Sequence, residues 1–153
     1  MKSMRRSDRK MDEKEALELL RRGEYGILCT CGSDNQPYGV PLSYVVIEDS
    51  IYFHCAEEGS KLDNITENSK VSFTVVGSTR LLPEKFSTAY ESVIVMGNAF
   101  SVSEEKKYDP LMELIYKYSP DFLEEGRAYV ERAKSKTKIV RIKIESITGK
   151  HRV

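Results

Sequence analysis

Short apolar runs along the chain predict strands at six places. The runs are rich in β-branched and aromatic residues and are bounded by glycine, proline or acidic residues, which is typical of strands in a packed sheet. They cover residues 26–31, 38–48, 51–55, 70–77, 92–103 and 137–147. Most neighbours in this order are joined by short polar turns, such as Asp49 and Ser50 between the second and third runs. Short connections favour antiparallel hairpins over the helix-linked crossovers of a parallel sheet.

Apolar residues recur three and four positions apart in four other stretches, which predicts helices there. These stretches are residues 12–22, 61–67, 104–118 and 122–134. The last two form a helical insertion over residues 104–134, just before the last strand. The segment from Ser78 to Lys85 contains Pro83 and is expected to be a mobile loop. The pattern therefore predicts a single domain over residues 1–153, mainly β (α+β), in which an antiparallel barrel carries peripheral helices.

Two residues interrupt the predicted strands. Pro41 lies within residues 38–48, where a proline removes a donor from the strand ladder. Either this strand is at an edge, or a flat ligand lies against it and hydrogen-bonds to its free backbone groups; the pattern alone leaves both open. Gly97 lies within residues 92–103 and predicts a bulge or bend.

Composition narrows the class of protein. A hydrophobic content of 40% and a charged content of 31% are values of a folded globular chain. The 24 basic and 24 acidic residues give a formal net charge of zero, which predicts neither a nucleic-acid surface nor an anionic-membrane surface. Residues 2–10 are locally basic and are expected to form a flexible, solvated terminus. Because no apolar run suits a signal peptide or a membrane helix, we expect a soluble, cytoplasmic protein.

The cysteines and histidines do not form a recognisable framework. The chain has three cysteines, Cys29, Cys31 and Cys55, and two histidines, His54 and His151. An odd and small number of cysteines argues against a disulfide scaffold. No pair of these residues has the spacing of zinc ligands, so no metal site is expected. The thiols are expected to be buried or half-buried in strands.

The stretch from Ile51 to Asn64 is the best candidate for a ligand contact on physical grounds. A strand leads into Gly59, and Ser60 and Lys61 then open a helix, with Ser60 as its expected N-cap. A strand that ends in a glycine turn and opens a helix directs backbone N–H groups and the positive end of the helix dipole at one spot. Such a corner suits a phosphate, but an ordinary capped helix with a solvated lysine explains the same residues.

Six segments, in this order, resemble the FMN-binding split-barrel proteins. They are residues 38–44 (YGVPLSY), 51–56 (IYFHCA), 59–65 (GSKLDNI), 71–76 (VSFTVV), 90–97 (YESVIVMG) and 147–150 (ITGK). Within this family the chain is similar to the 5-nitroimidazole-resistance (Nim-type) group, whose members are relatives of pyridoxamine 5′-phosphate oxidase. The resemblance spans about residues 5–150. Each motif alone is moderately specific, and their order and spacing together carry the assignment.

The resemblance implies a six-stranded split β-barrel that forms a homodimer with two FMN molecules at the subunit interface. It also implies three groups of FMN-binding residues in this sequence. The strand that lies along the isoalloxazine ring would supply Val40, Pro41, Leu42, Ser43 and Tyr44. The ribityl phosphate would be held by His54, Cys55, Ala56, Ser60 and Lys61, with Asn64 beside them. The partner subunit would contribute Tyr90, Glu91, Ser92 and Val93.

The activity that the resemblance implies is an FMN-dependent oxidoreductase. Electrons would pass from flavin N5 to a small aromatic nitro acceptor, with His54 and Tyr90 as candidate catalytic residues. Two alternatives remain open: a flavin- or haem-binding carrier or sensor without turnover, and a flavin reductase. The chain departs from its relatives in carrying Ser60 where a second basic residue is common. It also lacks the arginine-containing C-terminal motif of true pyridoxamine 5′-phosphate oxidases, which argues against oxidation of vitamin B6.

Overall fold

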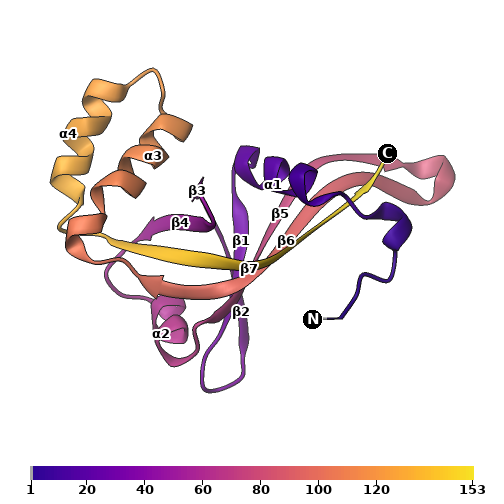
Figure 1. Ribbon diagram of the computed structural model, residues 1–153, viewed down its shortest axis with the longest axis horizontal. Helices are drawn as coiled ribbons and strands as arrows, with labels where there is room; N and C mark the ends of the chain where they lie inside the picture. Colours follow the sequence, from indigo (N-terminus) through magenta and orange to yellow (C-terminus); the bar gives the residue numbers. More distant parts are fainter. Residues whose placement is uncertain (1) are drawn as a thin grey trace.

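Seven strands form one curled antiparallel sheet in the computed structural model, which describes residues 2–153 (Figure 1). The strands are β1 (Gly26–Cys31), β2 (Pro37–Leu42), β3 (Val45–Ile47), β4 (Ser50–Cys55), β5 (Lys70–Leu82), β6 (Ser87–Ser101) and β7 (Lys138–Arg152). Their order in the sheet is β2-β1-β5-β6-β7-β4-β3. Every neighbouring pair is antiparallel. The predicted fold class, an antiparallel split barrel with peripheral helices, is confirmed.

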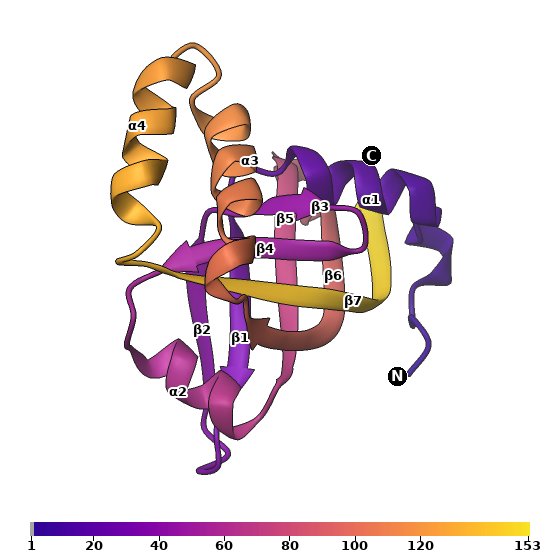
Figure 2. The ribbon, with the colours of Figure 1, turned by 60° about the vertical axis from the view of Figure 1, so that its left-hand side comes forward.

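The helices lie outside the sheet, as predicted. They are α1 (Glu13–Arg22), α2 (Ser60–Glu67), α3 (Tyr108–Tyr118) and α4 (Leu123–Ala133), with three short 3₁₀ helices, η1 (Ser7–Arg9), η2 (Pro83–Lys85) and η3 (Glu104–Lys106). The N-terminus of α1 is capped by Asp12, whose carboxylate accepts the N–H of Glu15 at 2.8 Å. Figure 2 shows α2 below the barrel, and α3 and α4 as a hairpin at one end of it.

The main core fills the inside of the curl. Its fully buried side chains come from five strands and α1, and they include Leu19, Leu28, Phe53, Phe73, Val93 and Ile142. A second, smaller cluster joins the helical insertion to the sheet through Leu111, Met112, Val130 and Ile139. The insertion is further held by Lys107, which is buried and donates from Nζ to Glu104 at 2.6 Å and to the carbonyl of Thr137 at 2.7 Å. The helical insertion is therefore packed onto the barrel.

The predicted strand over residues 38–48 is two strands, which is why the sheet has seven strands and not six. The chain leaves β2 at Leu42 and begins β3 at Val45, so β2 and β3 lie at the two opposite edges of the sheet. The break follows from Tyr44, which turns into the core. Its ring is fully buried and packs edge-to-face on Phe73 at 4.8 Å, and its hydroxyl donates to the carbonyl of Leu20. The edge position of β2 confirms the edge-strand interpretation of Pro41.

A long β-arm replaces the predicted mobile loop. That prediction was wrong, because residues 79–82 of β5 pair with residues 87–90 of β6 and extend away from the barrel (Figure 1). These strands pair mainly with each other, and Pro83 with its charged neighbours gives the segment the local pattern of a loop. At the tip, Phe86 has a φ of 50° and is 97% exposed. Strand β6 therefore starts five residues earlier than predicted.

The predicted bulge is confirmed, since the β6–β7 register shifts between Met96 and Gly97. The turn before β4 consists of Glu48 and Asp49, because Ile47 pairs with Ser50. Strand β7 continues past Ile147 to Arg152.

Candidate functional site

The corner between β4 and α2 has the predicted strand–glycine–helix geometry, with one correction. Gly59 is the residue before the helix and has a φ of 151°, which glycine adopts readily and other residues rarely do. Ser60 is the first helical residue and makes no side-chain capping bond, so its predicted role as N-cap was wrong. The first intrahelical bond runs from the N–H of Asp63 to Gly59 at 3.1 Å. The N–H groups of residues 60–62 are therefore not used by the helix.

Two lysines place positive charge at the end of β4. Burial raises the pKa of the Cys55 thiol, while the charges of Lys61 and Lys138 act to lower it. Lys138 is the residue opposite Cys55 in the β4–β7 pairing, and Lys61 lies in the first turn of α2. The corner thus combines two cations with a helix N-terminus, which together can hold an anionic group. Lys138 was missed in the sequence, since nothing local links the start of the last strand to this corner.

Helix α2 is fixed to the β1–β2 hairpin by polar contacts. Asn64 donates from Nδ2 to the hydroxyl of the buried Thr30 at 3.0 Å, and Glu67 accepts the N–H of Ser33 at 2.6 Å. The amide of Asn64 is thus engaged in positioning the helix. Ala56 is exposed beyond the end of β4. These contacts set the direction in which the first turn of α2 points.

The residues predicted to lie along the isoalloxazine ring are on β2 and on the link that follows it. Val40 and Leu42 are half-buried, and Pro41 is exposed on the edge strand. The backbone of Tyr44 already has partners. Its N–H donates to the hydroxyl of Tyr118 at 3.0 Å, and its carbonyl accepts from Lys117 Nζ at 3.0 Å. The backbone of Tyr44 is therefore not available to a ligand.

Lys117, near the C-terminal end of α3, has an unusual environment. Lys117 Nζ lies 3.8 Å from the centroid of the buried Tyr44 ring. Burial lowers the pKa of Lys117 to about 8, and no carboxylate in residues 2–153 forms an ion pair with it. Tyr118, the next residue, donates to the carbonyl of Glu24 at 2.6 Å. The C-terminal end of α3 thus secures the β2–β3 link.

Ser43 and His54 share a cleft of about 270 Å³ beneath the helical insertion. The rest of its lining comes from the two helices and the loop between them: Leu111, Leu114, Ile115, Tyr118, Ser119 and Tyr129. Partial burial of the ring lowers the pKa of His54, which favours the neutral imidazole. The two aromatic residues were missed as site residues in the sequence, where the helical pattern reports only which residues repeat and not what they face.

The remaining candidates lie at the base of the β-arm. Tyr90 and Glu91 line a cavity of about 420 Å³ together with Arg80, His151 and Arg152. Burial acts to raise the pKa of Tyr90, but hydrogen bonds from Arg9 and Lys150 outweigh it and bring the pKa below its ordinary value.

Glu91 is held by two donors. The N–H of Ser78 at 3.0 Å and the guanidinium of Arg22 at 2.9 Å lower the pKa of this carboxyl. Ser92 is half-buried, whereas the side chain of Val93 is fully buried in the barrel core. The side chain of Val93 is therefore closed to a ligand, and its backbone lies within the sheet between β5 and β7.

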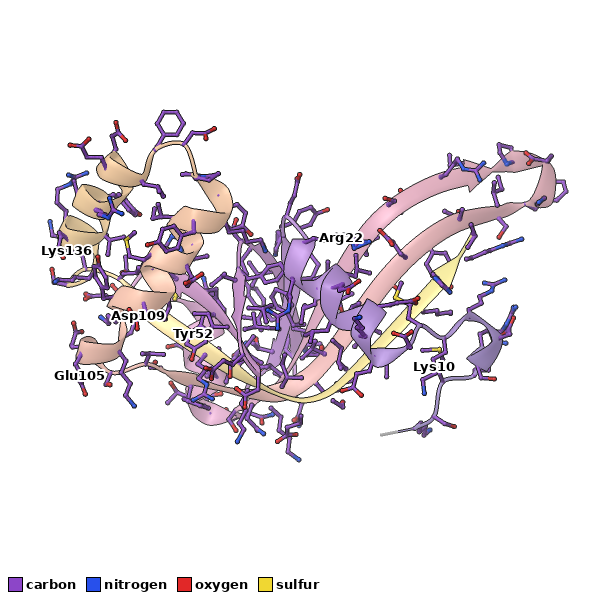
Figure 3. The ribbon with its side chains drawn as sticks, turned by 45° about the horizontal axis from the view of Figure 1, so that its top comes forward. Lys10, Arg22, Tyr52, Glu105, Asp109 and Lys136 are labelled. Carbon is purple, nitrogen blue, oxygen red and sulfur yellow. The ribbon has the colours of Figure 1, made fainter. Side chains whose placement is uncertain are left out.

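Within one chain, the candidates near the β4–α2 corner and those at the base of the β-arm lie far apart along the sheet. His54 pairs with Ile139 on β7, and Tyr90 pairs with Arg152. Thirteen positions of β7 separate these partners, which corresponds to about 40 Å of strand. Figure 3 shows the same separation, with Tyr52 and Asp109 at the helical end and the arm at the other.

The described residues, 2–153, contain neither a cluster of metal ligands nor a membrane-spanning helix. They contain no group of three or more histidine, cysteine or acidic side chains placed to hold a metal ion. None of the helices in this range has the length and apolar character needed to cross a membrane.

Comparison with known proteins finds a family and a shared fold. The family model of pyridoxamine 5′-phosphate oxidase matches residues 12–151. No curated protein sequence matches the chain. Many solved structures share its fold, among them the following three. A candidate 5-nitroimidazole antibiotic resistance protein from Bacteroides thetaiotaomicron is 21% identical, with a TM-score of 0.78 over 92% of this chain and 85% of that one.

The second and third structures come from mycobacteria. A conserved hypothetical protein from Mycobacterium tuberculosis is 23% identical, with a TM-score of 0.82 over 98% of this chain and 91% of that one. An FAD and heme binding protein from Mycobacterium smegmatis is 17% identical, with a TM-score of 0.81 over 94% and 73%. At these identities the three structures establish the fold of the chain and not its ligand.

Proposed function

This chain belongs to the pyridoxamine 5′-phosphate oxidase family, and on that premise we propose that it is an FMN-dependent reductase of small aromatic nitro compounds. The observation that carries the proposal is the β4–α2 corner, where Lys61, Lys138 and free N–H groups of α2 converge. A phosphate monoester needs this combination of point charges and directed donors. The residues present therefore fit the phosphate end of FMN.

The edge strand β2 is suited to contact the isoalloxazine end of FMN. Val40 and Leu42, half-buried on one face of β2, offer an apolar strip on a strand with no neighbour on its outer side, and Pro41 lies on the opposite face. A flat heterocycle needs an apolar wall and a few backbone groups for its polar edge, and Ser43 extends this strip toward the cleft. Tyr44 is buried and acts here as the anchor of the link, not as a contact.

We place the second half of the site on the partner subunit of a homodimer. Tyr90, Glu91, Ser92 and Val93 lie too far along the sheet to reach the corner of their own chain. The outer face of β6 exposes Ile94, Met96 and Phe100, an apolar surface that supports burial against a second copy. The two cofactors would then lie between subunits, each held by both.

The chain's own residues would bind, orient and exclude water, while bound flavin supplies hydride transfer through its N5. The lysines at the corner fix the phosphate, and the strip on β2 keeps water from one face of the ring. His54, whose pKa is lowered by partial burial, accepts a proton at the mouth of the cleft. Tyr90 is the second candidate for this role, from the partner subunit.

The test starts with the absorbance spectrum of the purified protein after addition of FMN. Flavin bands at one FMN per chain are expected. Lys61→Ala should weaken FMN binding by about 10- to 100-fold, the loss of one charge-assisted contact, while the fold is retained. Lys14→Ala on the exposed side of α1 is the matched control and should bind as the wild type does. A wild-type protein that takes up no flavin would falsify the proposal, and an unchanged affinity in Lys61→Ala would remove the corner from it.

A non-catalytic flavin or haem carrier is the second candidate, favoured by the shared fold of the mycobacterial FAD and heme binding protein. Turnover separates the two. In a reductase, a nicotinamide dinucleotide bleaches the flavin bands and a nitroaromatic restores them within seconds to minutes. A carrier shows no restoration that depends on the acceptor. A flavin reductase instead releases its flavin, which gel filtration of the reduced protein detects.

A further inference from the structure

We propose that the cleft beneath α3 and α4 is the acceptor pocket, and that it takes a neutral, planar molecule with a single ring. The inference rests on the proposed function, because it identifies where the electron acceptor binds. It assigns selectivity to the helical insertion, an element outside the barrel.

The size of the cleft limits its occupant. Its volume of about 270 Å³ is slightly below the range of about 300–1,000 Å³ for pockets that hold drug-sized ligands. A single aromatic ring with one or two substituents fills such a space, whereas a nucleotide does not. The cleft is therefore too small for the electron donor and suits a small acceptor.

The lining of the cleft selects for a neutral ring. Leu111, Leu114 and Ile115 provide aliphatic surface, and Tyr118 and Tyr129 provide two aromatic rings. The hydroxyl of Tyr118 is engaged with backbone groups of Glu24 and Tyr44, so this residue contributes its ring. Within the described part of the chain, no lysine, arginine, aspartate or glutamate lines the cleft. An anionic or cationic molecule would lose its hydration there without a compensating charge.

Polar side chains line both sides of the cleft, with Ser119 and Tyr129 on the helical side and two others on the barrel side. Ser43 and His54 come from the β2–β3 link and from β4, and both belong to the candidate flavin site. A ring in the cleft can direct a polar substituent toward these two side chains, on the side where the flavin is proposed to lie. This arrangement orients the reducible group of an acceptor and leaves its apolar part against the helices.

The roof of the cleft is held in place. Gly126 of α4 packs directly on Ile115 of α3, where a Cβ atom would collide with the isoleucine side chain. Lys107 is buried and bonded to the carbonyls of Lys134 and Thr137, so both ends of the insertion are joined. A preformed pocket spends little binding energy on ordering its own walls.

The test uses the absence of tryptophan from the sequence. Tyr129→Trp places a single indole in the cleft, and Phe122→Trp places one nearby on an exposed position that does not line it. In the flavin-free protein, nitrobenzene should quench the Tyr129→Trp emission saturably. The anion 4-nitrobenzoate should bind at least about 10-fold more weakly, a difference of one decade in affinity. Phe122→Trp should show only linear, collisional quenching by both compounds.

Ser119→Phe in the Tyr129→Trp background fills the cleft and should abolish saturation. Linear quenching in the Tyr129→Trp protein, equal binding of the anion, or saturation that survives Ser119→Phe would each overturn the inference. FMN uptake is measured separately on the same variants by absorbance. Saturable quenching without FMN uptake would support the pocket and overturn the proposed function. FMN uptake without saturable quenching would support the proposed function and overturn the pocket.

Discussion

The two ends of strand β7 carry two different kinds of cavity. At the helical end, the cleft beside Ser43 and His54 is apolar and aromatic, and the nearby Lys117 has no carboxylate partner in residues 2–153. At the arm end, the cavity beside Tyr90 is lined by Arg80, His151 and Arg152. One sheet thus positions an apolar surface and a charged surface about 40 Å of strand apart.

The difference shows how the two ends are stabilised. The helical end depends on buried contacts, centred on the Tyr44 ring against Phe73 and on the bonds from α3 to the Tyr44 backbone. The arm end depends on exposed or half-exposed charges, such as the pair between Arg22 and Glu91. Burial contributes several kcal/mol per side chain, about 3–5 for an aromatic residue, whereas exposed ion pairs contribute about 1 kcal/mol or less. The helical end is therefore structurally essential, and the arm end is free to serve an interface.

The largest effect is expected from removing the two tyrosines that mark these ends. Tyr44→Ala should lower the free energy of unfolding by about 3–5 kcal/mol, because a fully buried ring is lost from the core. Tyr90→Ala should lower it by about 1 kcal/mol or less, because its ring is only partly buried. Urea denaturation measures both. Equal losses would mean that the ends are stabilised in the same way and would break the comparison.

A second effect is expected where the ends meet across a dimer. Lys61→Ala and Tyr90→Ala should each weaken FMN binding, since one disturbs the corner and the other the partner's contribution. When the two variants are refolded together, about half of the dimers should contain one chain of each kind. One of the two sites in such a mixed dimer has both halves intact, so about one quarter of all sites should recover wild-type affinity. Fluorescence titration of FMN counts these sites. No recovery on mixing would place both halves of the site within one subunit.

The smallest effect is a pH dependence specific to the helical end. Burial lowers the pKa of Lys117 to about 8, whereas a lysine in the unfolded chain has a pKa of about 10.4. Between these values the unfolded chain holds a proton that the folded chain has released, so the free energy of unfolding should rise with pH from about 8 toward 10. Above this range, the raised pKa of Tyr44 acts in the opposite direction.

Lys117→Met isolates this contribution. The variant should lose the rise in stability between about pH 8 and 10, and Lys14→Met on the exposed face of α1 should keep it. Thermal denaturation at several pH values measures the slope. An identical slope in all three proteins would show that the charge of Lys117 is as well solvated as that of any surface lysine.

Sequence patterns predicted the fold well where side-chain burial alternates, and poorly where it does not. Strand β1 and helix α1 were predicted almost residue by residue, because their apolar positions face one core. The run over residues 38–48 has apolar residues on both sides of its break, so nothing local separates β2 from β3. The break depends on Phe73 and Leu20, which are remote in sequence.

The candidate site was predictable only in its local parts. Lys61 and Gly59 belong to one short stretch whose backbone geometry follows from its own residues. Lys138 and Tyr129 reach the same end of the barrel through strand pairing and helix packing. Such contacts depend on register and crossing geometry, which a single sequence does not specify.

The two-residue link at Ser43 and Tyr44 also bears on aggregation and on how the chain closes. It connects the two outermost strands of the sheet, so the barrel is closed by the chain itself at a small cost in loop entropy. One of these edges carries Pro37 and Pro41, and the other is only three residues long; both features discourage pairing with foreign strands. A circular permutant opened between Ser43 and Tyr44 would keep every strand but release both edges, and it should aggregate more readily than its parent.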